Sequence, residues 1–269
     1  MTADFLASNG WDIAICSRNE AEVKDAAERL AQEHGVASIG MAVNIADPIE
    51  VESFARRVSV ELGPVHALVC NAAILGPVGS VAQVEPADMA ATLAVNVLGF
   101  SNCLKFFWPG LVAVRGFRVI ALAGGGLGGP GQMKRAPAYV PSKAALVSMI
   151  EMISDEVVEA GGTINAIAPG NIPTGFMKSV LLAGEVFAGK ELFEQAAERE
   201  GKPVGNSLER FFDLLSFLLD EHTDFVSGRF LSARWNTPDA LASLRTEGLS
   251  DSLFTLRRID DDLYSEGKP

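Results

Sequence analysis

Short apolar runs alternate with helical patterns along almost the whole chain, and this alternation restricts the fold more than any other feature. The apolar runs lie at 11–16, 37–43, 66–70, 117–123, 163–168 and 228–233. Helical patterns lie between them, at 20–34, 47–62, 86–108, 138–160 and 207–220. The runs are continuous rather than alternating, which is typical of strands buried on both faces. We therefore expect an α/β fold: a Rossmann-type, doubly wound parallel sheet with helices on both faces.

Three prolines help to place the ends of the expected helices. Asp47 is a good N-cap, and Pro48 occupies the first helical position. Pro109, followed by glycine, predicts the end of the long helix at 86–108. Pro141 is tolerable only in the first turn of the helix at 138–160, so that helix begins just before it.

The chain has the length and composition of one large globular domain. It has 269 residues, of which 48% are hydrophobic and 21% charged, enough for a well-buried core. We expect the domain to span 1–235. The polar tail at 236–269 is expected to be a surface wrap, an oligomer contact or partly disordered.

The net charge of −12 argues against nucleic acid as a partner, because phosphate binding needs a basic stripe. No stretch approaches the ~18–20 uninterrupted apolar residues of a membrane span. The opening "MTADFLASNGWD" has no basic region of the kind that begins a signal peptide. We therefore expect a cytoplasmic protein without a membrane partner.

The cysteines and histidines predict no metal site. Cys16, Cys70 and Cys103 each lie in an apolar run and are expected to be reduced core thiols. His34, His66 and His222 are scattered, without the spacing of metal ligands.

The strongest candidate for chemistry is a tyrosine–lysine pair in "AYVPSKAAL". Tyr139 and Lys143 are four residues apart at the start of the expected helix, so both lie on one helix face. A nearby ammonium favours the phenolate, which would lower the tyrosine pKa and make the phenol a general acid and base. An exposed helical pair without a function has the same spacing.

Four segments in order carry a resemblance to a known family: "VCNAA" (69–73), "VNVLG" (95–99), "AYVPSK" (138–143) and "NAIAPGNIPT" (165–174). As a set they resemble the short-chain dehydrogenase/reductase family over about residues 11–235. The resemblance implies an oxidoreductase that interconverts an alcohol and a carbonyl by hydride transfer.

The resemblance also implies roles for individual residues. Tyr139 matches the catalytic acid and base, Lys143 the residue that binds the nicotinamide ribose and tunes the tyrosine, and Asn96 the asparagine that holds a proton-relay water. The other matched positions are expected to bind the cofactor: Asn71, Ala72 and Ala73 beside its ribose and adenine, and Pro169, Gly170, Ile172 and Thr174 at its nicotinamide. Cys70 and Ala73 depart from the family's usual Asn and Gly.

The cofactor is expected to be NADP(H), with NAD(H) possible. After the first run the chain has Ser17 and Arg18, a hydroxyl and a cation able to grip a 2′-phosphate, where an acidic residue would favour NAD(H). An arginine that merely caps a surface turn is the alternative. Asn44 and Ile45, after the second run, lie where the family approaches the adenine.

The stretch "VIALAGGGLGGPGQ" at 119–132 satisfies the G-x-G-x-x-G pattern but does not run directly into a helix, as a phosphate loop must. In the family this place holds the catalytic serine, which would fall at Ala123 or Gly124. Ala123, Gly124 and Gly125 are therefore candidate substrate-binding residues without a hydroxyl. Losing such a donor typically costs roughly 10²–10³ in rate.

The family's first strand and glycine loop are expected to be missing from this chain. Without that central strand, two neighbouring strand edges stay unpaired or close on each other. Either the true start lies ~20–25 residues upstream, given an ordinary strand–turn–helix opening, or the chain is a truncated relative.

The preferred reading is an NADP(H)-dependent oxidoreductase acting on a small carbonyl or alcohol, with a lid at 170–187 that carries Phe176, Met177, Val180 and Leu181. The alternative is a non-catalytic member that serves as a binding or oligomer subunit. The resemblance implies a homodimer or homotetramer formed through the helices at 86–108 and 138–160. The sequence does not identify the substrate.

Overall fold

The computed structural model describes residues 1–124, 127, 133–172, 175–200 and 206–257. Within these residues, six parallel strands form two sheets, β1–β2 and β3–β4–β5–β6. The strands are β1 (Ile13–Ser17), β2 (Ser38–Ala42), β3 (Ala67–Cys70), β4 (Arg118–Leu122), β5 (Thr163–Ala168) and β6 (Arg229–Ser232). Each lies within one of the six apolar runs or extends it by one residue, so the predicted strands are confirmed.

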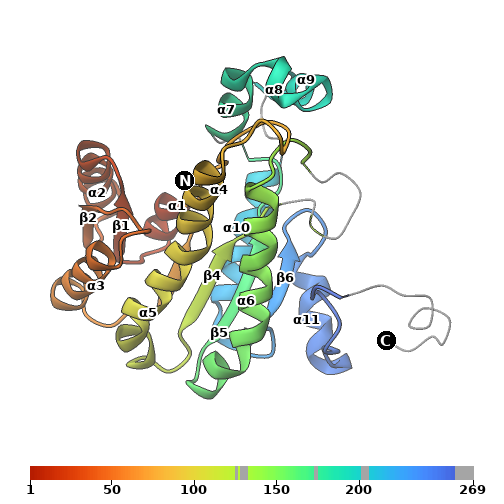
Figure 1. Ribbon diagram of the computed structural model, residues 1–269. Helices are drawn as coiled ribbons and strands as arrows, with labels where there is room; N and C mark the ends of the chain where they lie inside the picture. The colour runs from red at the N-terminus through yellow and green to blue at the C-terminus, as the bar shows by residue number, and fades with distance from the viewer. Residues whose placement is uncertain (125–126, 128–132, 173–174, 201–205, 258–269) are drawn as a thin grey trace.

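Helices cover the strands and connect them (Figure 1). They are α1 (Thr2–Ser8), α2 (Glu20–His34), α3 (Pro48–Glu61), α4 (Pro86–Leu93), α5 (Gly99–Val112), α6 (Tyr139–Glu159), α7 (Gly175–Ala183), α8 (Glu185–Ala188), α9 (Lys190–Arg199), α10 (Ser207–Leu219) and α11 (Pro238–Glu247). Asp47 caps α3 as predicted: its Oδ1 accepts a hydrogen bond from Ile49 N at 2.8 Å.

Alternate residues of β4 enter two different cores, which confirms that helices pack on both faces of the sheet. Val119 and Ala121 pack with residues of α3, α5 and α6. Ile120 and Leu122 pack with residues of α1, α10 and α11. Every residue of β4 and β5 is buried, in keeping with their continuous apolar runs.

Strands β1 and β3 do not pair with each other in the part of the chain that the structure describes. In Figure 1, β1 and β2 lie with α2 and α3 to one side of the larger sheet. Most of β1 and all of β3 are only half-buried, unlike β4. Of the two outcomes expected without a central strand, the structure therefore shows unpaired edges and not a closed gap.

The long helix differs from the prediction at both its middle and its end. A π-helical turn, Ala94–Leu98, separates α4 from α5, and α5 continues through Pro109 to Val112. The predicted stop at Pro109 is wrong. A proline this close to the end of a helix removes one hydrogen bond, and burial of Leu111 at 0% exposure compensates for that loss.

The stretch Pro86–Val112 also has the length and apolar composition of a membrane-spanning helix. Core helices of globular proteins share these two properties. Here 28% of the most apolar window is buried. Asn96, Phe107 and Leu111 are buried and α5 packs on α3 and β3, so one face of the stretch belongs to the core and the other is exposed.

The segment after Trp235 folds back onto the domain. Leu241 of α11 is buried in the core on the α10 side. Farther along, the carbonyl oxygen of Phe254 accepts a hydrogen bond from Phe230 N in β6 at 2.7 Å, and Arg257 forms an ion pair with Glu151 of α6. Of the three alternatives for the tail, these contacts match a surface wrap as far as residue 257.

Candidate active site

The predicted tyrosine–lysine pair lies where helix α6 begins, at the carboxyl ends of the strands. Tyr139 is the first residue of α6, and Lys143 follows one turn later. The Lys143 Nζ atom lies 5.9 Å from the centroid of the Tyr139 ring and donates a 2.6 Å hydrogen bond to the Leu122 carbonyl oxygen at the end of β4. Lys143 is 3% exposed, so the predicted pair is in place with its cation under the ring.

Burial controls the protonation of both groups. It raises the pKa of Tyr139 to about 12 and lowers the pKa of Lys143 to about 8, although the nearby Cys70 thiol opposes the latter change. Burial therefore moves the tyrosine pKa in the direction opposite to the lowering expected from Lys143. A neutral phenol at neutral pH is suited to donate a proton.

Asn96 holds the loop after β3 against the start of α6. Its Oδ1 accepts from Ile74 N at 2.8 Å, and its Nδ2 donates to the Ile74 carbonyl oxygen and to Ser142 Oγ, both at 2.9 Å. Ser142 Oγ in turn donates to the Tyr139 carbonyl oxygen at 2.6 Å. Asn96 sits in the π-helical turn, a feature that often marks functional sites.

Ser142 is a site residue that the sequence reasoning missed. Helical spacing turns its side chain away from the Tyr139 phenol, so the sequence pattern gives it no role in proton transfer. The structure shows it fully buried, as the link between Asn96 and the backbone of Tyr139. A serine facing the buried side of an apolar helix was the available signal, because such a hydroxyl needs a partner.

A cleft of about 1730 Å³ opens in front of this pair. Several predicted residues line it together, from the ends of β3, β4, β5 and α6: Asn71, Ala72, Ala73, Ala123, Gly124, Tyr139, Lys143, Pro169, Gly170 and Ile172. Thr174 and Gly125 lie outside the described residues. The cleft exceeds the ~300–1,000 Å³ of ordinary small-ligand pockets, so it has room for a dinucleotide and a substrate.

The other predicted cofactor residues lie on the smaller sheet and do not line this cleft. Ser17 ends β1, and its hydroxyl bonds within the turn to Asn19. Arg18 follows it and is exposed. The backbone N–H of Asn44 donates to Glu50 Oε2 at 2.6 Å, and the Ile45 carbonyl oxygen accepts from Asn102 Nδ2 at 2.9 Å. The structure thus groups Asn71–Ala73 with the residues predicted at the nicotinamide and leaves Ser17, Arg18, Asn44 and Ile45 apart from them.

Gly124 is the residue beside the Tyr139 hydroxyl. A Cβ added there would lie 3.1 Å from Tyr139 Oη. Ala123 packs instead into the core with α3, α5 and α6. Of the two places where the family's serine could fall, Gly124 is the one next to the phenol, and a glycine offers no hydroxyl.

Helices α7, α8 and α9 stand together over this end of the molecule (Figure 1). We call them the helical cap. Val180 is fully buried in its apolar cluster, and Phe176 packs edge-on against the Tyr139 ring with centroids 4.9 Å apart. Phe176 and Met177 also line the cleft, so part of the predicted lid faces the site and part is packing.

The cysteines do not form a ligand set. Cys16, Cys70 and Cys103 are free thiols and pack against the core with α3, α5 and α6. Burial raises the pKa of the Cys16 thiol to about 12, so it stays protonated.

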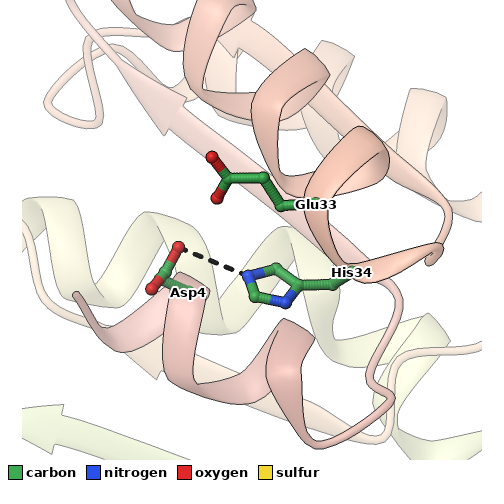
Figure 2. Close-up of side chains that lie close together, drawn as sticks. All are labelled: Asp4, Glu33 and His34. Carbon is green, nitrogen blue, oxygen red and sulfur yellow. Dashed lines mark hydrogen bonds and ion pairs between the residues drawn. The ribbon is translucent and has the colours of Figure 1, made fainter.

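One cluster of possible metal ligands occurs among the described residues: Asp4, Glu33 and His34, on α1 and α2 (Figure 2). His34 Nε2 lies 3.4 Å from Asp4 Oδ1. The Arg29 guanidinium already pairs with Asp4 at 2.8 Å and Glu33 at 2.7 Å. One guanidinium therefore bridges both carboxylates without a metal, and the cluster is a structural link between the two helices.

Comparison with known proteins agrees with this geometry. Residues 1–233 match the family model described as Enoyl-(Acyl carrier protein) reductase. The chain belongs to the short-chain dehydrogenase/reductase family. Among its relatives is the 3-oxoacyl-[acyl-carrier-protein] reductase FabG of Staphylococcus epidermidis, 30% identical over 62% of this chain and 67% of that protein.

Solved structures of short-chain dehydrogenases share the fold. An NAD⁺-bound xylitol dehydrogenase has a TM-score of 0.72 at 22% identity, covering 86% of this chain and 91% of that one. An NADPH-bound short chain oxidoreductase of Pseudomonas aeruginosa PAO1 with an atypical catalytic center has a TM-score of 0.71 at 20% identity, covering 86% and 88%. Because it belongs to this family, the chain is a short-chain oxidoreductase. The family includes proteins that bind NAD⁺ and proteins that bind NADPH.

Proposed function

We propose that this short-chain oxidoreductase uses NADP(H) to interconvert an alcohol and a carbonyl, with Tyr139 as the general acid and base. The observation that carries the proposal is the cleft itself. It brings Tyr139 and Lys143 together with the segments after β3 and β5, Asn71–Ala73 and Pro169–Ile172. The first segment is expected beside the ribose and adenine of the cofactor, and the second at its nicotinamide.

The residues present fit the nicotinamide end of the cofactor. Lys143 uses one N–H on the Leu122 carbonyl oxygen and has two further donors for ribose hydroxyls. Ala72 and Ala73 leave the backbone beside the cleft uncovered by large side chains. Pro169, Gly170 and Ile172 would hold the carboxamide side. When bound, the cofactor would supply or accept the hydride.

The chain's own residues manage the proton. In reduction, the neutral Tyr139 hydroxyl donates its proton to the carbonyl oxygen, and in oxidation the phenolate takes it back. Lys143, one turn below, favours the phenolate when it is protonated. Asn96 fixes the loop and the start of α6. Both its amide hydrogens are used, so a relay water would bind its Oδ1 or its backbone carbonyl oxygen.

Arg18 supports the preference for NADP(H). It follows β1, is exposed, and forms no ion pair within the described ranges, so its guanidinium is available for a 2′-phosphate. We predict that calorimetry gives a Kd for NADPH at least about tenfold below that for NADH, and that Arg18→Ala removes this difference.

Arg56→Ala is the matched control, because Arg56 is also an exposed arginine without an ion pair in the described chain. It should leave both affinities unchanged. Equal binding of NADPH and NADH by the unmodified protein would contradict the preference. Failure to bind either cofactor at micromolar concentration would contradict the oxidoreductase proposal as a whole.

The alternative, a non-catalytic binding or oligomer subunit, is favoured by one observation: the residue beside the Tyr139 hydroxyl is Gly124, which cannot polarise a carbonyl with a side chain. For either function we propose a cytoplasmic homodimer or homotetramer formed through α4–α5 and α6. Leu98 is 58% exposed and Met152 72%, and burial between subunits would remove this apolar surface from water.

A further inference from the structure

The active-site cleft is basic although the protein is acidic. The whole chain has 22 lysines and arginines against 34 aspartates and glutamates, but eight lysines and arginines line the cleft against two glutamates. Lys143 belongs to the catalytic pair. The other seven surround the cleft, and five of them come from the cap and the segment before α6: Lys134, Arg135, Lys178, Lys190 and Arg199.

Three of these five cations have no carboxylate partner in the ranges that the structure describes. Lys134 pairs with Glu191 at 3.1 Å and Lys190 with Glu194 at 3.8 Å. Arg135, Lys178 and Arg199 form no such pair. We call these three the cationic rim.

Arginines outside the cleft include both paired and unpaired cations in the described ranges. Arg57 lies 2.7 Å from Glu61, and Arg118 lies 2.7 Å from Asp224. With acidic groups in excess, unpaired cations gathered in one cleft repel each other at a cost, unless an anion joins them. Their grouping therefore indicates a ligand with negative charge.

Arg135 is held in place by its backbone. It has φ +60°, a left-handed conformation uncommon for a residue with a side chain. Its carbonyl oxygen accepts from Gly79 N at 2.9 Å. Its Nε lies 3.7 Å from where a Cβ of Gly189 would be, at the start of α9. The side chain thus lies at the junction of the cap with the segment that leads to Tyr139.

The 2′-phosphate of the cofactor does not account for this rim. The residues expected at its 2′-phosphate end, Ser17 and Arg18, lie on the smaller sheet and do not line the cleft. The rim comes from the cap and the segment before α6, and the cap touches the Tyr139 ring through Phe176. Apolar Phe176 and Met177 line the same cleft.

We propose that the substrate carries an anionic group, a carboxylate or a phosphate, which Arg135, Lys178 and Arg199 bind while the carbonyl faces Tyr139. The apolar part of the substrate lies along Phe176 and Met177. This inference rests on the proposed function, because it names the substrate class of the same site.

Two measurements test the proposal, one with turnover and one without. The first compares KM in NADPH consumption for matched pairs: oxo acids of increasing carboxylate-to-ketone spacing against their methyl esters, and dihydroxyacetone phosphate against dihydroxyacetone. We expect the charged member of at least one pair to have a KM about tenfold or more below that of its neutral partner. The pair that shows this distinguishes a carboxylate from a phosphate.

The double substitution Arg135→Gln/Lys178→Gln should raise KM for the charged member by about tenfold or more and change that of the neutral member less than about twofold. Lys178→Gln/Arg199→Gln is a second variant that leaves the backbone of Arg135 untouched. Arg56→Gln is the control for general loss of positive charge. Equal KM values within every pair, or equal effects of the variants on both members, would overturn the proposal.

The second measurement does not depend on catalysis. Calorimetry follows binding of octanoate, octyl phosphate and neutral octanamide to the protein with NADPH present and absent. We expect one anion to bind more tightly than octanamide, and both double variants to lose this difference. That result supports anion binding by the cationic rim even if no carbonyl is reduced. That result would separate failure of the oxidoreductase proposal from failure of this one. Equal affinities for all three probes would overturn the proposal that the cationic rim binds an anionic group.

Discussion

The neighbour of the Tyr139 hydroxyl at the end of β4 is a glycine, and a substitution there tests what the missing side chain costs. Gly124→Ser puts a hydroxyl beside the phenol, since its Cβ lies 3.1 Å from Tyr139 Oη. The ring must shift by a few tenths of an ångström to admit it. If a hydroxyl polarises the substrate carbonyl at this place, kcat rises, by as much as the roughly 10²–10³ that one such donor contributes elsewhere.

Gly124→Ala is the matched control, because it adds the same Cβ without the hydroxyl. Steady-state kinetics of both variants and the parent separate polarisation from crowding. A Gly124→Ser enzyme no faster than Gly124→Ala would show that the site does not use a hydroxyl there.

At the scale of residues, the sequence was sufficient to predict which side chains lie together where their spacing along one helix determines the geometry. Tyr139 and Lys143 follow from four-residue spacing on a helix. The raised pKa of Tyr139 could not be predicted in this way, because burial by Phe176 and other parts of the cap is a tertiary effect. The partners of Asn96 were equally out of reach, since Ile74 and Ser142 are brought to it by folding.

At the scale of elements, Asn96 joins the π-helical turn to the loop after β3 and to α6. Asn96→Ala leaves Ile74 N–H and C=O without partners at a part-buried position. Because each buried unsatisfied group costs about 1–3 kcal/mol, we expect a loss of about 2–4 kcal/mol in the free energy of unfolding. Urea denaturation measures it.

Asn102→Ala is the matched control on α5. Asn102 makes one such bond, to the Ile45 carbonyl oxygen at 2.9 Å, so its loss should cost about 1 kcal/mol. Equal destabilisation by the two alanines would contradict the view that Asn96 is a multiple link.

Elements were predictable where local signals agree with tertiary packing. The range 20–34 became α2 with Asn19 as its cap, and 163–168 became β5. The end of the long helix was not, because a proline stop signal competes with burial of Leu111, which no local pattern reveals. The π-helical turn was equally invisible, since it accompanies contacts of Asn96 across the fold.

At the scale of the whole molecule, the division into two sheets predicts uneven stability. β1 has a hydrogen-bonded strand on one side only among the described strands, whereas β4 and β5 have one on each side and are fully buried. Hydrogen exchange should therefore show β1 and β2 amides protected at least about tenfold less than those of β4 and β5. Equal protection would mean that the two sheets open as one unit.

The layered α/β architecture was predictable from the alternation of apolar runs and helices, because a strand buried on both faces has a continuous apolar sequence. The grouping of site residues was predictable only in part. Residues after β3 and β5 meet at one sheet edge, but Arg18 and Asn44 belong to a sheet whose position depends on contacts between elements. The basic lining of the cleft, spread from Lys134 to Arg234, has no compact signature in the sequence.

The central claim is that this cleft reduces or oxidises a substrate with Tyr139 as the proton donor and acceptor. The most direct measurement compares NADPH-dependent carbonyl reduction by the parent protein and Tyr139→Phe, with NADPH affinity measured on both. We predict that kcat falls about 10²–10⁴-fold in the variant while its Kd for NADPH stays nearly the same. Unchanged turnover in Tyr139→Phe would contradict the account.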